Sequence, residues 1–176
     1  GRQKDRHQEV YKLRIANQRS ALLTNAIMIF FKKPRTLRQG GGTMGGYKDL
    51  EDYGIIGNLD TCALVGKDGS IDWLCFEHLG SPSVFASLLD AENGGSCWIR
   101  PATKFDSRQT YDGDTNILHT SFTTPLGDVL ITDFMPVEGI KETSPVSRVL
   151  RKVECLKGAV KMAVGIRPRF NYAASI

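Results

Sequence analysis

The sequence predicts an all-β fold, an antiparallel β-sandwich that carries one short helix. An Asp-Gly pair separates two apolar runs within residues 61–76, which is the strongest short-range signal for a β-hairpin. Apolar and polar residues alternate later in the chain, over residues 116–124 and 160–166. Helical spacing of apolar residues is confined to residues 81–90. Many short strands with one small helix favour a sandwich.

The first predicted hairpin turns at Asp68-Gly69. A two-residue type I′ turn needs positive φ at both positions, which Gly adopts freely and Asp tolerates. This turn would place Val65 opposite Asp72. Both faces would carry apolar residues, as in an interior hairpin: Leu64, Ile71 and Trp73 on one, and Ala63, Val65 and Leu74 on the other.

The helix is predicted from its capping residues. A short edge strand over residues 53–56 leads into the hairpin. After the hairpin, Ser81 can cap a helix over residues 81–90, with Pro82 at its first position. Its apolar face would consist of Phe85, Leu88 and Leu89.

Strands account for the rest of the chain. We expect a strand over residues 96–100 and a second hairpin that joins residues 116–124 to 129–135. A third hairpin would join residues 146–156 to 160–166 by a turn near Lys157-Gly158. Its second strand would have one apolar face, made of Val160, Met162, Val164 and Ile166.

The charge of the chain is divided unevenly. Residues 1–46 hold ten Lys and Arg against two acidic residues, whereas residues 47–176 hold thirteen against seventeen. The mildly acidic body argues against a nucleic-acid-binding domain. We expect residues 1–43 to be a disordered or artefactual leader that does not pack on the sandwich, set off by the Gly-rich linker 39–46. A stray amphipathic helix and a targeting segment are the alternatives, and the apolar run 21–31 is too short for a membrane span of about 20 residues.

Five stretches carry a family resemblance. In order they are DYGIIGNLDTCALVGKDGSIDWLCF, SPSVFASLLDAENGG, YDGDTNILHTSF, DVLITDFMPV and RPRFNY. Over residues 47–173 the chain resembles the N-terminal domain of glycoside hydrolase family 15, which groups bacterial and archaeal glucoamylases, glucodextranases and trehalases. The resemblance implies a large β-sandwich, part of a super-sandwich, ahead of a catalytic (α/α)6 barrel that is absent from this chain. Residues 44–176 would be this domain, truncated at its C-terminus.

The resemblance assigns no catalytic residue to this chain. Inverting hydrolysis needs two carboxyl groups about 6.5–9.5 Å apart, and in the family both are glutamates of the barrel. Glutamates of residues 47–176 are scattered in turn or strand-surface contexts, where solvated charge is the ordinary role, among them Glu51, Glu77, Glu92, Glu138 and Glu154.

The segment between the first hairpin and the helix would come closest to a substrate. The family commonly reads LPRFDSPSVF here, and residues 76–85 read FEHLGSPSVF, with Leu79 in place of the aromatic residue and Gly80 in place of the aspartate. The substrate-proximal candidates are Asp72, Trp73, His78 and Ser81. The alternative roles are turn chemistry and helix capping for the polar residues and core packing for the Trp.

The cysteines predict neither a metal site nor a disulfide framework. Cys62, Cys75, Cys97 and Cys155 show no CxxC spacing, and the histidines have no partner at ligand spacing. The predicted turn places Cys62 opposite Cys75, as two free thiols in contact in a reducing cytoplasm. We therefore expect no metal, no cofactor and a cytoplasmic protein.

Two functional hypotheses follow. The first is the N-terminal domain of a glucoamylase-like or trehalase-like hydrolase of carbohydrate metabolism, whose partners are the missing barrel and an α-glucan or trehalose. This chain alone would then be catalytically silent. The second is a non-catalytic carbohydrate-binding or scaffolding module. Neither involves nucleic acid or a membrane, and the choice of α-glucoside depends on barrel loops outside this chain.

Overall fold

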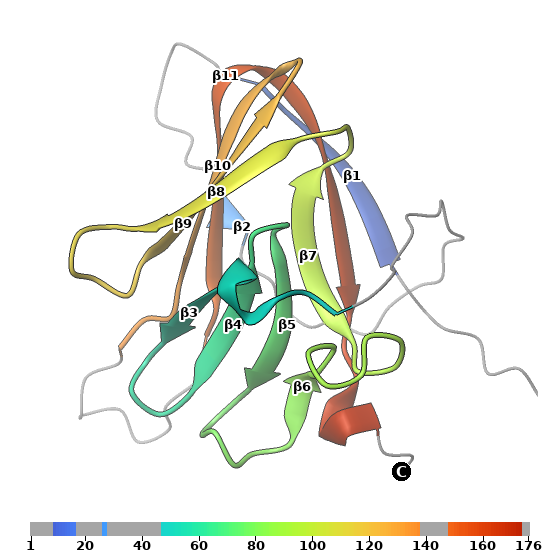
Figure 1. The fold of residues 1–176 in the computed structure, drawn as a ribbon, viewed down its shortest axis with the longest axis vertical. Helices are drawn as coiled ribbons and strands as arrows, with labels where there is room; N and C mark the ends of the chain where they lie inside the picture. The colour runs from blue at the N-terminus through green and yellow to red at the C-terminus, as the bar shows by residue number, and fades with distance from the viewer. Residues whose placement is uncertain (1–8, 17–25, 28–46, 138–147, 174–176) are drawn as a thin grey trace, which may run out of the picture.

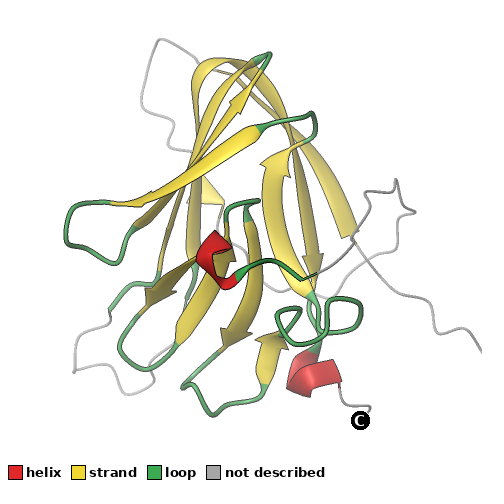
Figure 2. Ribbon diagram, viewed as in Figure 1, coloured by secondary structure: helices red, strands yellow, loops and turns green. Residues whose placement is uncertain are grey.

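The protein is a two-sheet antiparallel β-structure. The structure, a computed structural model, describes residues 9–16, 26–27, 47–137 and 148–173. Figure 2 shows strands and loops with only two short helical turns among these residues. The predicted all-β sandwich without a catalytic barrel is confirmed. Among the described residues, no helix is long and apolar enough to cross a membrane.

The strands are β1 (Glu9–Ala16), β2 (Ala26–Ile27), β3 (Tyr53–Gly57), β4 (Cys62–Gly66), β5 (Ser70–Cys75), β6 (Ser83–Phe85), β7 (Ser96–Pro101), β8 (Asp106–Tyr111), β9 (Leu118–Thr124), β10 (Gly127–Phe134) and β11 (Leu150–Arg167). The two 3-10 turns are η1 (Leu50–Asp52) and η2 (Phe170–Ala173). The predicted edge strand, the strand over residues 96–100 and the second hairpin are confirmed as β3, β7 and β9–β10.

One long strand joins the two sheets (Figure 1). The strand order is β3-β4-β5-β7-β11-β10-β9-β8, with β6 on β5 and with β1 and β2 on β11. The first half of β11 pairs with β10 and its second half with β7. At the far ends of this order, the Tyr111 hydroxyl on β8 donates to the carbonyl of Ile55 on β3 (3.0 Å) and accepts from its N–H (2.8 Å). A side chain thus closes the sandwich into a near-barrel.

The apolar interior consists of two neighbouring clusters. The first contains Ile56, Ala63, Val65, Ile71, Leu74, Val84, Phe85, Cys97, Leu118 and Met135. The second contains Ile99, Phe122, Val129, Ile131, Val153, Val160, Met162 and Val164.

The predicted third hairpin is wrong, because β11 is continuous through Lys157 and Gly158. Gly158 has φ of 71° and pairs with Gly127, next to a bulge in the β10–β11 ladder. The strand therefore bends here and changes sheets instead of turning back on itself. A Gly at a strand bend and a Gly at a turn look alike in sequence. The alternation after the bend was predicted correctly, since Val160, Met162 and Val164 are buried.

The predicted helix over residues 81–90 is also wrong. Residues 83–85 form β6, in which Phe85 pairs with Leu74 of β5. The next backbone N–H groups bond across a loop: Ala86 donates to the carbonyl of Gly94 (2.9 Å) and Ser87 to that of Gly95 (3.1 Å). Val84 and Phe85 are both in the first core cluster. Burial on both sides of the segment and backbone partners 8 to 11 residues away outweigh its helical spacing.

The first hairpin exists, but its turn is one residue longer than predicted. The Gly69 N–H donates to the Gly66 carbonyl (2.9 Å), which makes a β-turn centred on Lys67 and Asp68. Gly69 has φ of 80°, whereas Asp68 does not have positive φ, so the turn is not type I′. Val65 consequently faces Ile71 instead of Asp72, and Ile71 lies in the core, not on the face of Trp73.

A compensating bulge restores the predicted register farther from the turn. Leu64 faces Trp73 and Ala63 faces Leu74, as predicted, and Asp72 is the extra residue between the two registers. A bulge re-aims the side chain of the extra residue. Here the bulge places the side chain of Asp72 on the outer face of the sheet, where its carboxylate is nevertheless buried.

Part of the basic leader pairs with the sandwich, against expectation. Residues 9–16, as β1, pair with residues 159–166 of β11, on the edge opposite β7. The physical reason is that the second half of β11 would otherwise present an unpaired edge. The rest of the predicted leader, apart from the short β2, lies outside the described residues.

A buried ion pair connects β10 and β11. Asp133 and Arg151 face each other in the ladder, and their side chains are fully buried. Nε of Arg151 donates to one carboxylate oxygen (2.7 Å) and Nη2 to the other (3.0 Å). Although burial opposes its charge, Asp133 holds the pKa of Arg151 above its usual range.

We expect Asp133→Ala to lower the free energy of unfolding by about 3–5 kcal/mol, because it leaves a buried guanidinium without its counter-charge. The double variant Asp133→Leu with Arg151→Met should recover much of this loss, since it removes both charges. Chemical denaturation of both variants measures the effect. Additive losses in the double variant would contradict the pairing.

Gly69→Ala and Gly113→Ala test the turn of the first hairpin. Both glycines have positive φ, but a Cβ on Gly69 would lie 2.0 Å from the Ile99 carbonyl oxygen, whereas a Cβ on Gly113 meets nothing within 4 Å. We expect Gly69→Ala to cost about 1–3 kcal/mol more than Gly113→Ala, because only the first displaces a neighbouring strand. Equal midpoints in urea would show that β7 does not approach the turn as described.

Candidate functional site

The buried carboxylate of Asp72 accepts hydrogen bonds from side chains in separate parts of the chain. Its Oδ2 accepts from Nζ of Lys48 (2.5 Å), the Tyr53 hydroxyl (2.8 Å) and the Ser70 hydroxyl (2.9 Å). Its Oδ1 accepts from the Ser87 hydroxyl (2.9 Å). Burial, and then the Asp72 carboxylate, raise the pKa of Tyr53 well above its usual value, so the phenol remains a donor. We call this group the Asp72 cluster.

A second carboxylate extends the Asp72 cluster to β7. The Lys48 ammonium lies 3.0 Å from Oδ1 of Asp68, and Nη1 of Arg100 lies 3.0 Å from Oδ2. Burial pushes the pKa of Asp68 upward, but Lys48, a hydrogen bond from Ser70, and Arg100 together hold it below its usual value. The Arg100 guanidinium also lies over the ring of Trp98, 4.8 Å from its centroid.

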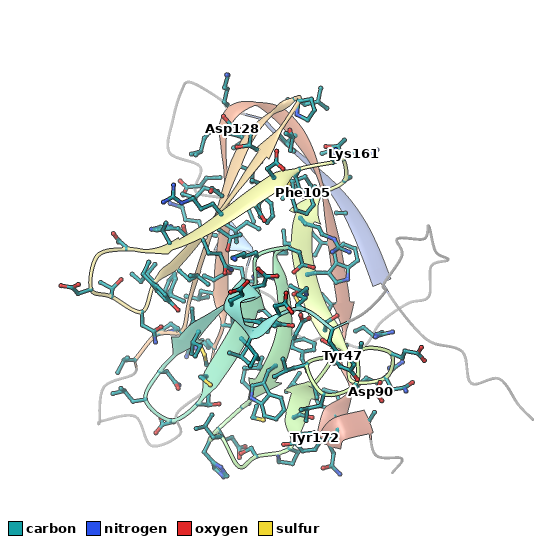
Figure 3. The ribbon with its side chains drawn as sticks, viewed as in Figure 1. Tyr47, Asp90, Phe105, Asp128, Lys161 and Tyr172 are labelled. Atoms are coloured by element: carbon teal, nitrogen blue, oxygen red, sulfur yellow. The ribbon has the colours of Figure 1, made fainter. Side chains whose placement is uncertain are left out.

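The Asp72 cluster holds a covering segment on the sheet. Lys48 precedes η1 in the segment 47–52, which crosses the outer face of β4, β5 and β7 in Figure 1. The Tyr47 hydroxyl donates to the carbonyl of Leu89 (3.1 Å), and Figure 3 shows Tyr47 beside the loop that carries Asp90. One ammonium between two carboxylates therefore anchors the chain where it enters β3.

The Asp72 carboxylate is engaged in hydrogen bonds within the fold. Both oxygens of Asp72 accept hydrogen bonds from the protein, and its side chain is only 8% exposed. The arrangement organises the fold.

The four substrate-proximal candidates separate into two groups. Asp72 belongs to the buried cluster, whereas Trp73 lies on the outer face of β5 with its ring 5.9 Å from that of Tyr172. His78 and Ser81 lie in the β5–β6 loop, where the Ser81 N–H donates to the His78 carbonyl (3.0 Å). Nδ1 of His78 accepts from the Gly80 N–H (3.1 Å). His78 is exposed and Ser81 is buried.

Three segments meet at one end of the sandwich, which we call the loop end: residues 58–61, 76–82 and 168–173. The Thr61 hydroxyl donates to the Cys75 carbonyl (2.7 Å), and the Tyr172 N–H donates to the Ser83 hydroxyl (2.8 Å). Figure 3 shows Tyr172 at the opposite end of the molecule from Asp128. Trp73, His78 and Ser81 thus lie at or near the loop end.

Cys62 and Cys75 are free thiols. Burial raises the pKa of both thiols. A raised pKa keeps a thiol protonated and unreactive. Among the residues that the structure describes, no three His, Cys, Asp or Glu side chains come together as a metal site.

Sequence reasoning missed Lys48, Tyr53, Ser87 and Tyr172. The RPRFNY stretch includes Tyr172 and was the available signal for it. Nothing in the sequence links Lys48 or Ser87 to Asp72, because each meets it only through the tertiary fold.

The fold and the Asp72 cluster define a β-sandwich domain whose outer layer is held by buried polar groups. A model of the family described as "Trehalase-like, N-terminal" matches residues 44–176, and the chain belongs to this family. No solved structure gives a significant match.

Curated relatives agree with this assignment. A trehalase of Thermoplasma volcanium is 36% identical over 133 residues, which cover 74% of this chain and 21% of the relative. A trehalase of Thermoplasma acidophilum is 40% identical over 114 residues, 62% of this chain and 19% of the relative. Trehalase 1 of Sulfolobus acidocaldarius is 40% identical over 124 residues, 70% of this chain and 20% of the relative. The chain spans about a fifth of the length of these relatives.

Asp68→Asn should make the free energy of unfolding less dependent on pH in the acid range. The pKa of Asp68 is lowered on folding from its ordinary 3.8, so its contribution is present above about pH 4 and is lost as the pH falls through the lowered value. We expect the variant to lose about 1 kcal/mol at pH 7 and to converge with the parent chain once the pH has fallen below the lowered pKa of Asp68. Asp60→Asn, an exposed carboxylate in a neighbouring loop, is the matched control. A constant difference between parent and variant across the range would contradict the assignment.

Proposed function

We propose that this chain is the N-terminal domain of a trehalase, in which it supports a C-terminal catalytic part of the same polypeptide. The observation that carries the proposal is the family match over residues 44–176. The relatives bear the name trehalase, and each is about five times as long as the part it shares with this chain. Trehalose is therefore favoured over a glucan as the substrate of the whole enzyme.

The catalytic carboxyl groups belong, in this proposal, to the C-terminal part. Both carboxylates of the Asp72 cluster are occupied by Lys48 and other donors. Glu51, Glu77 and Glu92 are exposed, and Glu154 is paired with Lys152 (2.9 Å). Glu138 and Glu142 lie outside the described residues. An inverting mechanism would use two carboxyl groups of the catalytic part.

Among the candidates for contact with substrate, the loop end supports Trp73 and His78 better than Asp72 and Ser81, which are buried. His78 is exposed in a loop closed by its own hydrogen bonds, so it is held toward solvent in one shape. Asp72 acts as an anchor for the segment 47–52. The neighbouring rings of Trp73 and Tyr172 favour one alternative, a carbohydrate-binding module, because aromatic faces stack on sugars.

Activity of the chain alone and of the longer polypeptide tests the proposal. We expect the polypeptide extended along its reading frame to release glucose from trehalose, and this chain alone to release none above a blank. Heat-inactivated samples of both proteins are the controls. Glucose release by this chain alone, or an extended enzyme that hydrolyses maltooligosaccharides and leaves trehalose intact, would refute it. Tight binding of trehalose by this chain alone would favour the binding module.

A further inference from the structure

Exposed apolar side chains are present in each segment of the loop end. Leu59 is 91% exposed, Leu79 57% and Tyr172 48%. A single exposed leucine is ordinary on a protein surface. Apolar residues contributed by three separate segments at one end are more informative, because such surfaces are common where another domain binds.

The backbone of the loop end is constrained as well. Among the described residues, every non-glycine residue with positive φ lies there: Leu59, Glu77, Asn171, Tyr172 and Ala173. Such conformations are unfavourable and persist only where surrounding contacts impose them. Here the Asn58 carboxamide accepts from the Thr61 N–H (3.0 Å), and the Ser83 hydroxyl accepts from the Tyr172 N–H (2.8 Å). The loops are therefore preorganised, which lowers the entropy lost on binding.

The path of the chain selects the occupant. β11 ends at Arg167, and residues 168–173 lead away across the loop end, where the Arg169 N–H donates to the Val84 carbonyl (2.9 Å). A part of the polypeptide that follows this domain is tethered at this end. A short tether gives an effective concentration in the millimolar range at nearby surfaces, and far less at the opposite end.

We propose that the loop end is the docking surface for the C-terminal catalytic part, with Leu59 and Leu79 packing into an apolar surface of that part. Tyr172, held by Ser83 and beside Trp73, sets the direction in which the chain leaves the sandwich. This inference rests on the proposed function, since it requires the catalytic part to follow this domain.

Hydrogen exchange tests the surface on the protein as it exists, as this chain and as the extended polypeptide. We expect amides of residues 58–61 and 76–82 to exchange at least tenfold more slowly in the extended polypeptide. Amides around the turn at Leu126, at the opposite end beside Asp128, should exchange equally in both. Unchanged exchange at the loop end in an extended polypeptide that hydrolyses trehalose would overturn the docking surface and leave the proposed function intact. Slower exchange at the loop end in an extended polypeptide that does not hydrolyse trehalose would support the docking surface and refute the proposed function.

A matched pair of substitutions gives a second readout. Leu79 and Leu126 are both 57% exposed, so Leu79→Ser and Leu126→Ser remove similar apolar surface from opposite ends. We expect Leu79→Ser to speed amide exchange at residues 58–61 at least tenfold relative to the parent extended polypeptide. Leu126→Ser should leave the exchange rate at these residues unchanged. Both variants should melt like the parent in this chain alone, which separates docking from folding. Equal effects of the two variants on protection would overturn the proposal.

Discussion

The structure depends on one constraint, that β11 must satisfy hydrogen-bond partners in two sheets. Its first half pairs with β10 and its second half with β7 and β1, so the strand has to bend where it passes from one sheet to the other. Gly158 and the adjoining bulge allow this bend. The same strand places Arg151 against Asp133 in the interior and delivers the chain to the loop end. The positions of both sheets follow from it.

Polar groups, as well as apolar ones, determine how the outer layer is attached. The bulge at Asp72 costs a regular ladder position, but it turns a carboxylate toward donors from the segment before β3, from β3 itself and from the loop after β6. The cluster thereby ties the segment 47–52 and the loop after β6 to the outer face of the sheet. A buried carboxylate with donors on both oxygens therefore helps to hold the outer layer on the sheet.

This arrangement suits a domain that supports chemistry elsewhere. The Asp72 carboxylate is engaged inside the fold, whereas the described non-glycine residues with positive φ are collected at the loop end, where the chain leaves β11. Binding free energy at such a surface is not reduced by ordering of the loops, because their own hydrogen bonds already define their shape. Support and attachment are thus separate features of the same sandwich.

Local patterns determined the fold class, most strand positions and the family. The alternation of Leu118, Thr120 and Phe122 and of Val160, Met162 and Val164 was sufficient because the two-residue period of a strand is a local property. The Asp-Gly pair located the first hairpin, and the quoted motifs pointed to Asp72 and Trp73. Tertiary structure decided the rest. The longer turn at Gly69 depends on contact with Ile99, β6 depends on Leu74 and Gly94, and β1 forms on the free edge of β11. The donors to Asp72 lie up to 24 positions away from it along the chain, and no local pattern reports where side chains that distant converge.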